Sequence, residues 1–437
     1  MIFALALPMA LAYLTTPILG LIDTAVAGRL GSEALMGGLA VGAIIIDVIF
    51  VSFNFQRSGT TGLAAQALGA QDEASMREVL FRALFVALLA GIVIPIVAPL
   101  VLEIALWFMA PGKAVADATA TYFQIRMLST GFTLANYAIL GWLVGLGRSA
   151  TTLILQVFLA ALNGALSIYL GLVEGWGLAG IAWATVISEA IAMMVGLMVC
   201  RHILGGLRLP PIARLIDRAA LRRLLDLNSN IMLRSFLLLL AFLLFTAQGV
   251  RLGETTLAAN AVLMHFFIVA GYFLDGLATA AEQVTGRSIG ARYQPAFRTG
   301  LRLVMFWDIV LAILLWLTMF AAGESAIALM TSLPSVREAA NGYMWLAAFT
   351  PVTGVVAFVM DGVFLGATWS RELGRMMILS FLLFAVALYG LSAIAGNTGI
   401  WLALHIFLIV RGVLLLAILP RKEREAFAPT VPANQAR

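Results

Sequence analysis

Long apolar segments recur along the whole chain, and they restrict its fold more than any other feature. A bilayer crossing takes about 20 apolar residues. A soluble protein of 437 residues, 62% hydrophobic and 11% charged, would expose much apolar surface, which a bilayer solvates. The short alternating segments of outer-membrane barrels are missing, so the sequence predicts an all-α polytopic membrane protein. Its twelve candidate transmembrane helices are roughly 3–25, 34–62, 79–109, 116–146, 150–172, 178–200, 226–249, 257–285, 301–322, 340–367, 374–395 and 398–420.

The basic residues are distributed unevenly between the loops. With the N-terminus placed inside, the loops of that side and the C-terminus hold 19 of the 27 basic residues. The opposite face holds four, namely Arg29, Lys113, Arg251 and Arg337. Cytoplasmic loops of membrane proteins carry such an excess, so we expect both termini in the cytoplasm. The net charge of +5 is then a topology signal, and we expect no nucleic-acid partner. The first segment lacks the basic start of a signal peptide.

Several chemistries lack their motifs in this sequence. The lone Cys200 excludes an internal disulfide and a multi-cysteine metal site. The three histidines have no metal-ligand spacing, and neither an HExxH nor a GxSxG motif occurs. A GxxxxGK[ST] phosphate loop is also missing, so the chain has no ATPase of its own. We therefore expect neither an enzyme nor a cofactor, and energy for transport would come from an ion gradient or a partner.

The chain repeats itself at an offset of 219 to 222 residues. "DTAVAGRLG" at 23–31 aligns with "FTAQGVRLG" at 245–253, and "QALGAQ" at 66–71 aligns with "RSIGAR" at 287–292. "GWLVGLGRS" at 141–149 aligns with "GVFLGATWS" at 362–370, and "GIAWA" at 180–184 aligns with "GIWLA" at 399–403. Six spans in each half predict two lobes related by an axis along the membrane normal. The expected parts are an N-lobe at 1–205, a cytoplasmic linker at 206–223, a C-lobe at 224–420 and a cytoplasmic tail at 421–437.

One carboxylate interrupts the stretch "GLIDTAVAGRLG" in the first segment. Asp23 could be an interfacial residue that pairs with Arg29, or it could lie within the bilayer. A charged Asp at the bilayer centre costs about 2.5–3.5 kcal/mol, which favours binding of a proton. Its counterpart in the second half is Phe245, so the acid is not an architectural feature of both halves. Pro8 and Pro17 permit a bend in the same helix.

Other polar residues also interrupt the apolar segments. Glu189 follows Thr185 by one helical turn, and its repeat counterpart is the apolar Leu408. Asn163 interrupts the fifth segment. Hydrogen bonding between helices is the alternative role for such residues, and an ion pair with Arg126 is the alternative for Glu189. Asp275 and Asp361 are expected near helix ends, in contact with solvent.

A second group of residues is a candidate for the substrate cleft. Asn136 and Tyr137 interrupt the fourth segment, and Met9 and Met36 belong to a chain rich in methionine. Methionine forms adaptable contact surfaces, although it also fills cores or faces lipid.

The sequence resembles the MATE family of multidrug and toxic-compound extrusion transporters, and within it the DinF-type branch. The resemblance rests on "LALPMALAYLTTPILGLIDTAVAGRLGSEALMGGLAVGA", "SGTTGLAAQALGAQ", "LANYAILGWLVGLGRS" and "GLAGIAWATVISE", and it covers essentially the whole chain. It implies twelve helices in two six-helix pseudo-symmetric lobes that form a V-shaped central cleft. It also implies antiport of organic cations or amphipathic drugs against H⁺ or Na⁺. We accordingly expect a multi-pass protein of the bacterial cytoplasmic (inner) membrane, surrounded by lipid and monomeric.

The resemblance also assigns roles to individual residues. Asp23 matches the acidic residue of the family's first helix, the principal protonation site of this branch. Asn163, Thr185 and Tyr122 match its N-lobe polar network. Ser167 stands where many prokaryotic relatives have a second Asp, which makes H⁺ the expected coupling ion and Na⁺ the less expected one. Glu189 is the candidate for the missing acid.

Three functions remain open at this point. The first is a proton-coupled drug antiporter, and Na⁺ coupling is its variant. The second is a lipid-carrier flippase of the wider superfamily, against which twelve spans and only four intramembrane arginines speak. The third is a membrane receptor or scaffold without transport, against which the internal duplication speaks.

Overall fold

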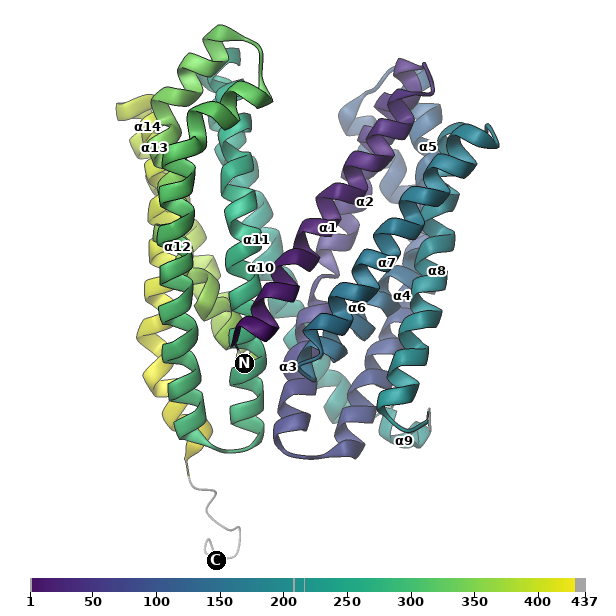
Figure 1. Ribbon diagram of the computed structural model, residues 1–437, viewed down its shortest axis with the longest axis vertical. Helices are drawn as coiled ribbons and strands as arrows, with labels where there is room; N and C mark the ends of the chain where they lie inside the picture. The colour runs from purple at the N-terminus through teal and green to yellow at the C-terminus, as the bar shows by residue number, and fades with distance from the viewer. Residues whose placement is uncertain (1, 207–208, 216, 429–437) are drawn as a thin grey trace, which may run out of the picture. The chain divides into compact units, whose positions relative to one another are not determined.

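The computed structural model describes residues 2–206, 209–215 and 217–428, and these residues form helices and turns without a β-strand (Figure 1). Arg208 of the expected linker and 429–437 of the expected tail lie outside the described residues. The elements are α1 Ile2–Gly28, α2 Glu33–Ser52, α3 Phe55–Gly69, α4 Glu73–Met109, α5 Lys113–Met127, α6 Thr130–Gly145, α7 Ser149–Ile168, the π-helix η1 Tyr169–Val173, α8 Gly177–Ile203, α9 Ile212–Leu215, α10 Arg218–Arg251, α11 Glu254–Gly290, α12 Gln294–Met330, α13 Pro334–Gly366 and α14 Ser370–Phe427.

The helices correspond to the twelve apolar segments. Among the described residues, ten helical stretches are long and apolar enough to cross a membrane. The α5–α6 pair, bent by 52°, makes a further broken span. Gly396 has non-helical backbone angles inside α14, so this long helix consists of two segments. The all-α polytopic prediction is confirmed, with twelve spans once α14 is counted as two.

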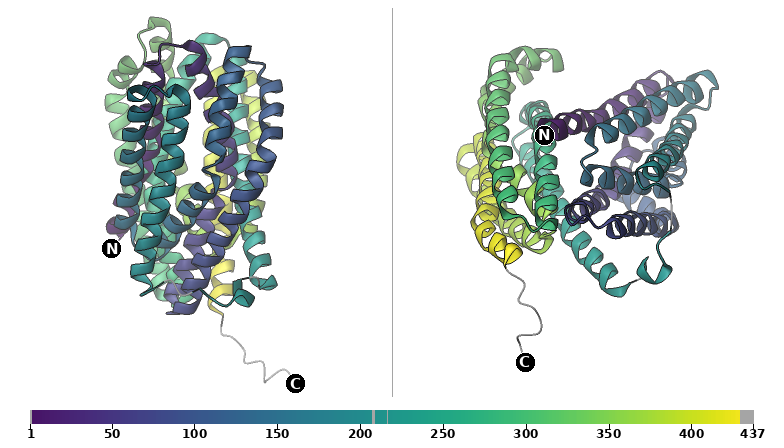
Figure 2. Two further views of the ribbon diagram at one scale, coloured as in Figure 1. Left: turned by 90° about the vertical axis from the view of Figure 1, so that its right-hand side faces the viewer. Right: turned by 60° about the horizontal axis from the view of Figure 1, so that its bottom comes forward.

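The chain forms two compact units, which we describe separately. The N-terminal unit comprises residues 7–64 and 73–232, and the C-terminal unit comprises residues 2–6, 65–72 and 233–428. The first turn of α1 and the end of α3 therefore belong to the C-terminal unit. The helices of each unit run beside one another for much of their length (Figure 2). The π-helix η1 extends α7, and α1 continues through Pro8 and Pro17.

Close helix contacts recur at equivalent positions of the two halves. A Cβ atom on Gly141 of α6 would lie 2.3 Å from the carbonyl oxygen of Arg57, and one on Gly362 of α13 would lie 2.0 Å from that of Ala278. These pairs are related by an offset of 221 residues. Only glycine permits such an approach of two backbones. The contacts therefore confirm the internal repeat at the level of helix packing.

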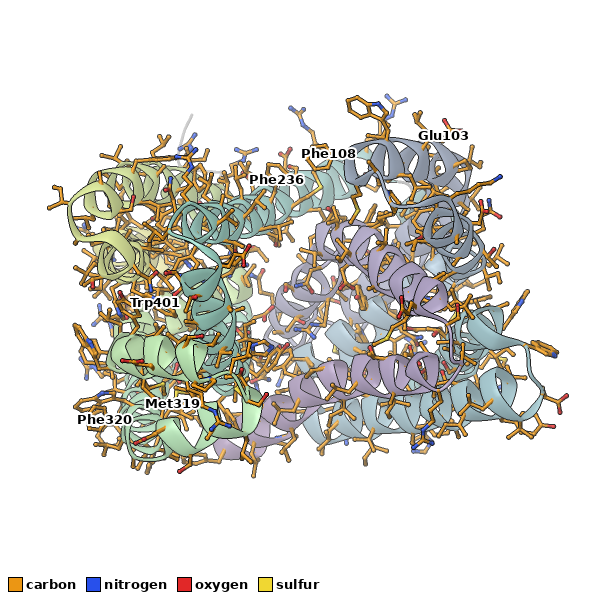
Figure 3. All side chains as sticks on the ribbon, turned by 90° about the horizontal axis from the view of Figure 1, so that it is seen from above. Glu103, Phe108, Phe236, Met319, Phe320 and Trp401 are labelled. Atoms are coloured by element: carbon orange, nitrogen blue, oxygen red, sulfur yellow. The ribbon has the colours of Figure 1, made fainter. Side chains whose placement is uncertain are left out.

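Apolar side chains occupy both the interior and the outer surface of the units. Trp401 in the C-terminal unit is fully buried, whereas Phe108 of α4 is 82% exposed and Phe320 of α12 is 64% exposed (Figure 3). A soluble protein rarely exposes large apolar patches. Exposed aromatic and aliphatic side chains on the long helices fit a surface that faces lipid.

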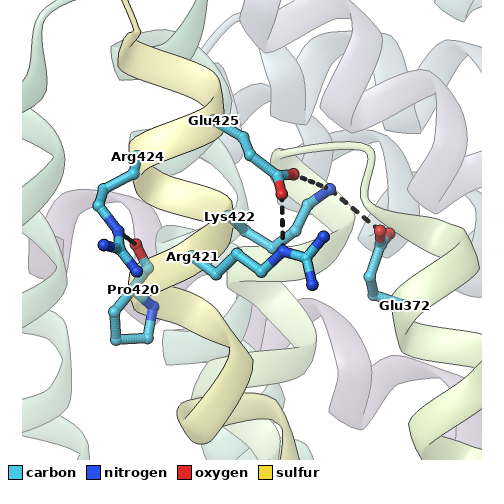
Figure 4. Close-up of polar contacts among 6 residues, drawn as sticks. All are labelled: Glu372, Pro420, Arg421, Lys422, Arg424 and Glu425. Carbon is cyan, nitrogen blue, oxygen red and sulfur yellow. Dashed lines mark hydrogen bonds and ion pairs between the residues drawn. The ribbon is translucent and has the colours of Figure 1, made fainter.

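Ion pairs gather at the end of α14, next to the start of the same helix. Lys422 donates to Glu372 at 3.0 Å and to Glu425 at 2.9 Å, and Arg421 also donates to Glu425 (Figure 4). The Arg421 side chain is 80% exposed. Exposed ion pairs of this kind contribute little to stability. The cluster belongs to a polar helix end outside the apolar stretch.

Candidate functional site

Asp23 lies inside the N-terminal unit, where α1 packs against α7. Its side chain is 6% exposed, and the Ser167 hydroxyl donates a hydrogen bond of 2.8 Å to its Oδ1. The helices approach closely because Gly164 of α7 leaves room for Ile22, which a Cβ atom there would meet at 3.1 Å. Asp23 is therefore buried and bonded to Ser167, unlike the interfacial position beside Arg29 that was considered as the alternative.

A second set of hydrogen bonds joins α7 to α8. Asn163, one turn before Ser167 on α7, donates from Nδ2 to Thr185 Oγ1 at 2.9 Å and to Ser188 Oγ at 3.4 Å. Asn163 is fully buried, and its Oδ1 has no hydrogen-bond partner among the described residues. The buried polar network therefore contains a carboxylate with one donor and, one turn away, an acceptor without a donor.

Tyr122 and Arg126 of α5 stand beside this network. Tyr122 is 4% exposed and lies against Gly42 of α2. Arg126 is close enough to interact electrostatically with Asp23, with Tyr122 and with Asp47 of α2. Its Nη1 donates to Ser129 Oγ at 2.7 Å. A fixed positive charge in this position compensates part of the charge of an ionised carboxylate.

Glu189 has a different partner from those expected. Asn136 of α6 donates from Nδ2 to Glu189 Oε2 at 2.6 Å and to its backbone carbonyl at 2.9 Å. Within the described chain, no nitrogen–oxygen distance of 4 Å or less joins Glu189 to Arg126, so the two do not form the ion pair considered as an alternative. Tyr137, the next residue on α6, is close enough to Glu189 to interact electrostatically. Glu189 and Asn136 thus form a polar pair of their own.

The remaining sequence candidates lie apart from these contacts. Met9 of α1 is 1% exposed and therefore packs in the core, whereas Met36 of α2 is 45% exposed. The structure brings Asp23, Asn163, Thr185 and Tyr122 into one interior, and it places Asn136, Tyr137 and Glu189 on the adjoining faces of α6 and α8.

Two residues of this interior were missed by the sequence reasoning. Ser167 was noted only as a departure from the family pattern, but it is the direct partner of Asp23. Asp47 interrupts the apolar stretch "GAIIIDVIF" and lies near Arg126. The rule that singled out Asp23, a carboxylate in an apolar run, also finds Asp47.

The equivalent place in the C-terminal unit is apolar. Phe245, the counterpart of Asp23, is 2% exposed and lies edge-on to Trp401, with ring centroids 5.2 Å apart. Leu408, the counterpart of Glu189, is 1% exposed. Each of the two acids of the N-terminal unit, Asp23 and Glu189, therefore has a buried apolar side chain as its counterpart in the C-terminal unit.

The expectation that Asp275 and Asp361 lie near helix ends in contact with solvent was wrong for part of each residue's position. Asp361 is 4% exposed and forms ion pairs with Arg234 of α10 and Arg411 of α14, so solvent does not stabilise it. Asp275 lies in the interior of α11 and not near its end. Asp361 does lie near the end of α13 at Gly366, but two arginines and not solvent surround it, whereas α11 continues far beyond Asp275 to Gly290.

The chain matches a known family over most of its length. The family model MatE matches residues 8–170 and 231–389. The chain belongs to the MatE family. A MatE protein with this arrangement of helices is a membrane transporter and not an enzyme.

Individual relatives agree with the MatE assignment. DNA damage-inducible protein F of Escherichia coli K12 is 38% identical over 435 residues, which are 98% of this chain and 93% of that protein. The probable multidrug resistance protein NorM of Chromobacterium violaceum is 25% identical over 97% of this chain and 94% of its own length. A solved structure described as the outward-facing conformation of a multidrug resistance MATE family transporter superposes with a TM-score of 0.89 at 17% identity, covering 97% of this chain and 96% of that one.

Proposed function

We propose that this MatE transporter is a multidrug antiporter that exports organic cations or other amphipathic drugs in exchange for protons. Asp23 is the carboxyl that binds the proton. The observation that carries the proposal is the buried contact of Asp23 with Ser167, one turn from the unpartnered Oδ1 of Asn163. A buried polar atom without a partner is costly, and a functional role is one explanation for its presence.

The network offers partners for both forms of the acid. When Asp23 is ionised, the Ser167 hydroxyl donates to it, and Arg126 supplies a nearby positive charge. When Asp23 is neutral, its own hydroxyl becomes a donor. Asn163 Oδ1 lies on the same face of α7 and is the acceptor that this donor needs. A carboxyl with alternative partners can gain and lose a proton without leaving the interior.

A change of partner for Asp23 would also move α1. The hydrogen bond to Ser167 fixes the register of α1 against α7, and α1 contains Pro8 and Pro17, each of which removes a backbone hydrogen bond. Donation to Asn163 instead would draw the helix by about one turn of α7. Such a shift could bias the transporter between two conformations, so that drug is released as protons enter.

Protons are favoured over Na⁺ as the coupling ion by the residues around Asp23. Ser167 occupies the position that would hold a second carboxylate, and its hydroxyl donates a hydrogen bond to Asp23. Hard cations prefer several oxygen ligands, among them carboxylates. One carboxylate whose nearest partner is a donor is better suited to a proton. Na⁺ coupling is the alternative.

We assign drug contacts in the N-terminal unit to Met36 and to the half-buried Tyr137. Met36 is exposed, and Tyr137, next to Asn136, combines an aromatic face with a hydroxyl. The curated relative NorM is described as a probable multidrug resistance protein, which supports drugs as the cargo.

We further propose that the protein is a monomer in the bacterial cytoplasmic membrane. The distribution of basic residues supports the placement of both termini in the cytoplasm.

Transport by the purified protein in liposomes tests this function. Efflux of a fluorescent cationic drug is followed with a pH gradient alone, with a Na⁺ gradient alone, and with neither. We expect the pH gradient to drive drug movement and the Na⁺ gradient at symmetric pH to drive little. Full efflux driven by Na⁺ at equal pH would reject proton coupling and support the alternative.

A further inference from the structure

A second carboxyl lies buried in the C-terminal unit, on α12. The Asp308 side chain is fully buried, and neither of its carboxyl oxygens has a hydrogen-bond partner among the described residues. An ionised carboxylate in an apolar interior is costly unless it is paired or hydrogen-bonded. Asp308 has neither compensation, so in this conformation it is stable only as the neutral acid.

Apolar side chains pack around the part of α12 that carries Asp308. One turn away on the same face of α12, Val304 and Ala312 are buried, and Ala312 packs with Leu274 of α11 and Val355 of α13. Residues 2–6 of α1 also pack near this region, through Leu5 and Ala6, and carry no titratable side chain. These side chains provide no donor for a carboxylate.

Charged groups of the neighbouring helices interact with Asp308 or with one another. Asp275 of α11 is close enough to Asp308 to interact electrostatically, and it also interacts with both Arg234 and Arg411. Those two arginines are held by Asp361 of α13. The further acid facing this cluster is Glu282 of α11, which interacts with Arg234.

We propose that Asp308 is a second proton-binding site of this transporter, neutral in the conformation described here and ionised in another conformation of the transport cycle. The proposal rests on the proton coupling proposed above. It gives the chain one proton-binding carboxyl in each half, Asp23 and Asp308, at positions that the internal repeat does not relate.

The arginine cluster supplies what an ionised Asp308 would need. Arg234 Nε is buried and has no hydrogen-bond acceptor among the described residues. Asp275 links the two features, because it interacts with both Arg234 and Asp308. A shift of α10 or α12 that brings an arginine nitrogen to Asp308 would stabilise the carboxylate as its proton leaves. Asp361 and Asp275 hold the arginines in place until then.

The number of protons exchanged per drug tests this proposal. At zero membrane potential, a gradient of one pH unit sustains a drug gradient of about tenfold for each coupled proton. The full-length protein is reconstituted with the potential clamped, and the steady drug gradient is measured. We expect about 100-fold for the natural protein and about tenfold for Asp308→Asn. Glu324→Gln, an exposed acid on the same helix, is the matched control and should behave like the natural protein.

The outcomes separate this proposal from the proposed function. A gradient of about tenfold in the natural protein, or an unchanged gradient in Asp308→Asn, would overturn the second site while leaving coupling through Asp23 in place. Failure of a pH gradient to move drug in the natural protein would reject the proposed function itself. Asp308→Ser provides the same test if the amide variant does not fold.

Discussion

At the scale of single residues, Asp23 is the position where a minimal change should separate folding from coupling. Asp23→Asn keeps nearly the same shape, and its amide can still accept a hydrogen bond from Ser167. It cannot bind or release a proton near neutral pH. We expect normal yield and thermal stability in detergent but loss of pH-driven efflux and of proton release on drug binding. Transport against a drug gradient at the natural rate would show that Asp23 is not the coupling residue.

Also at the scale of single residues, Asp361 shows how burial determines the contribution of an ion pair to stability. Asp361→Ala leaves the half-buried Arg234 and the buried Arg411 without their shared partner, and breaking a buried pair costs about 3–5 kcal/mol. We expect a clearly lower thermal midpoint. Glu425→Ala removes an acid from an exposed cluster and should leave the midpoint unchanged. Similar midpoints for both variants would contradict the role assigned to the buried cluster.

At the scale of helices, the crossing of α3 with α11 depends on two glycines that the internal repeat relates. A Cβ atom on Gly69 of α3 would lie 2.0 Å from the carbonyl oxygen of Arg287, and one on Gly290 of α11 would lie 1.9 Å from that of Gln66. We expect Gly69→Ala and Gly290→Ala each to force the helices apart and to lower the thermal midpoint by a similar amount. Gly390→Ala in α14 meets no atom within 4 Å and should cause no loss. Unequal effects of the first two substitutions would argue against equivalent packing.

The helices themselves could be predicted, but their breaks and contacts could not. The length of each apolar segment can be read from the sequence, so the sequence predicted each span. The break between α2 and α3 at residues 53–54 contains no proline, and nothing in the local composition marks it. The contact between Asp23 and Ser167 depends on how far α1 is shifted along α7. The two residues are 144 positions apart, and nothing in the sequence indicates that shift. Asp308 was within reach, because it interrupts an apolar segment as Asp23 does.

At the scale of the whole molecule, the orientation in the membrane follows from charges on loops and can be tested by labelling. Leu209 in the linker is 73% exposed, and Lys113, the first residue of α5, is also exposed and lies on the opposite side of the expected topology. Cys200 is fully buried and is replaced by Ala to give a background without cysteine. An impermeant maleimide added to intact cells should label Lys113→Cys at once and Leu209→Cys only after the cells are permeabilised. The excess of basic residues places the linker and both termini on the same side of the membrane. Labelling of position 209 from outside would therefore show that the entire topology is inverted. Protons would then have to enter from the other face.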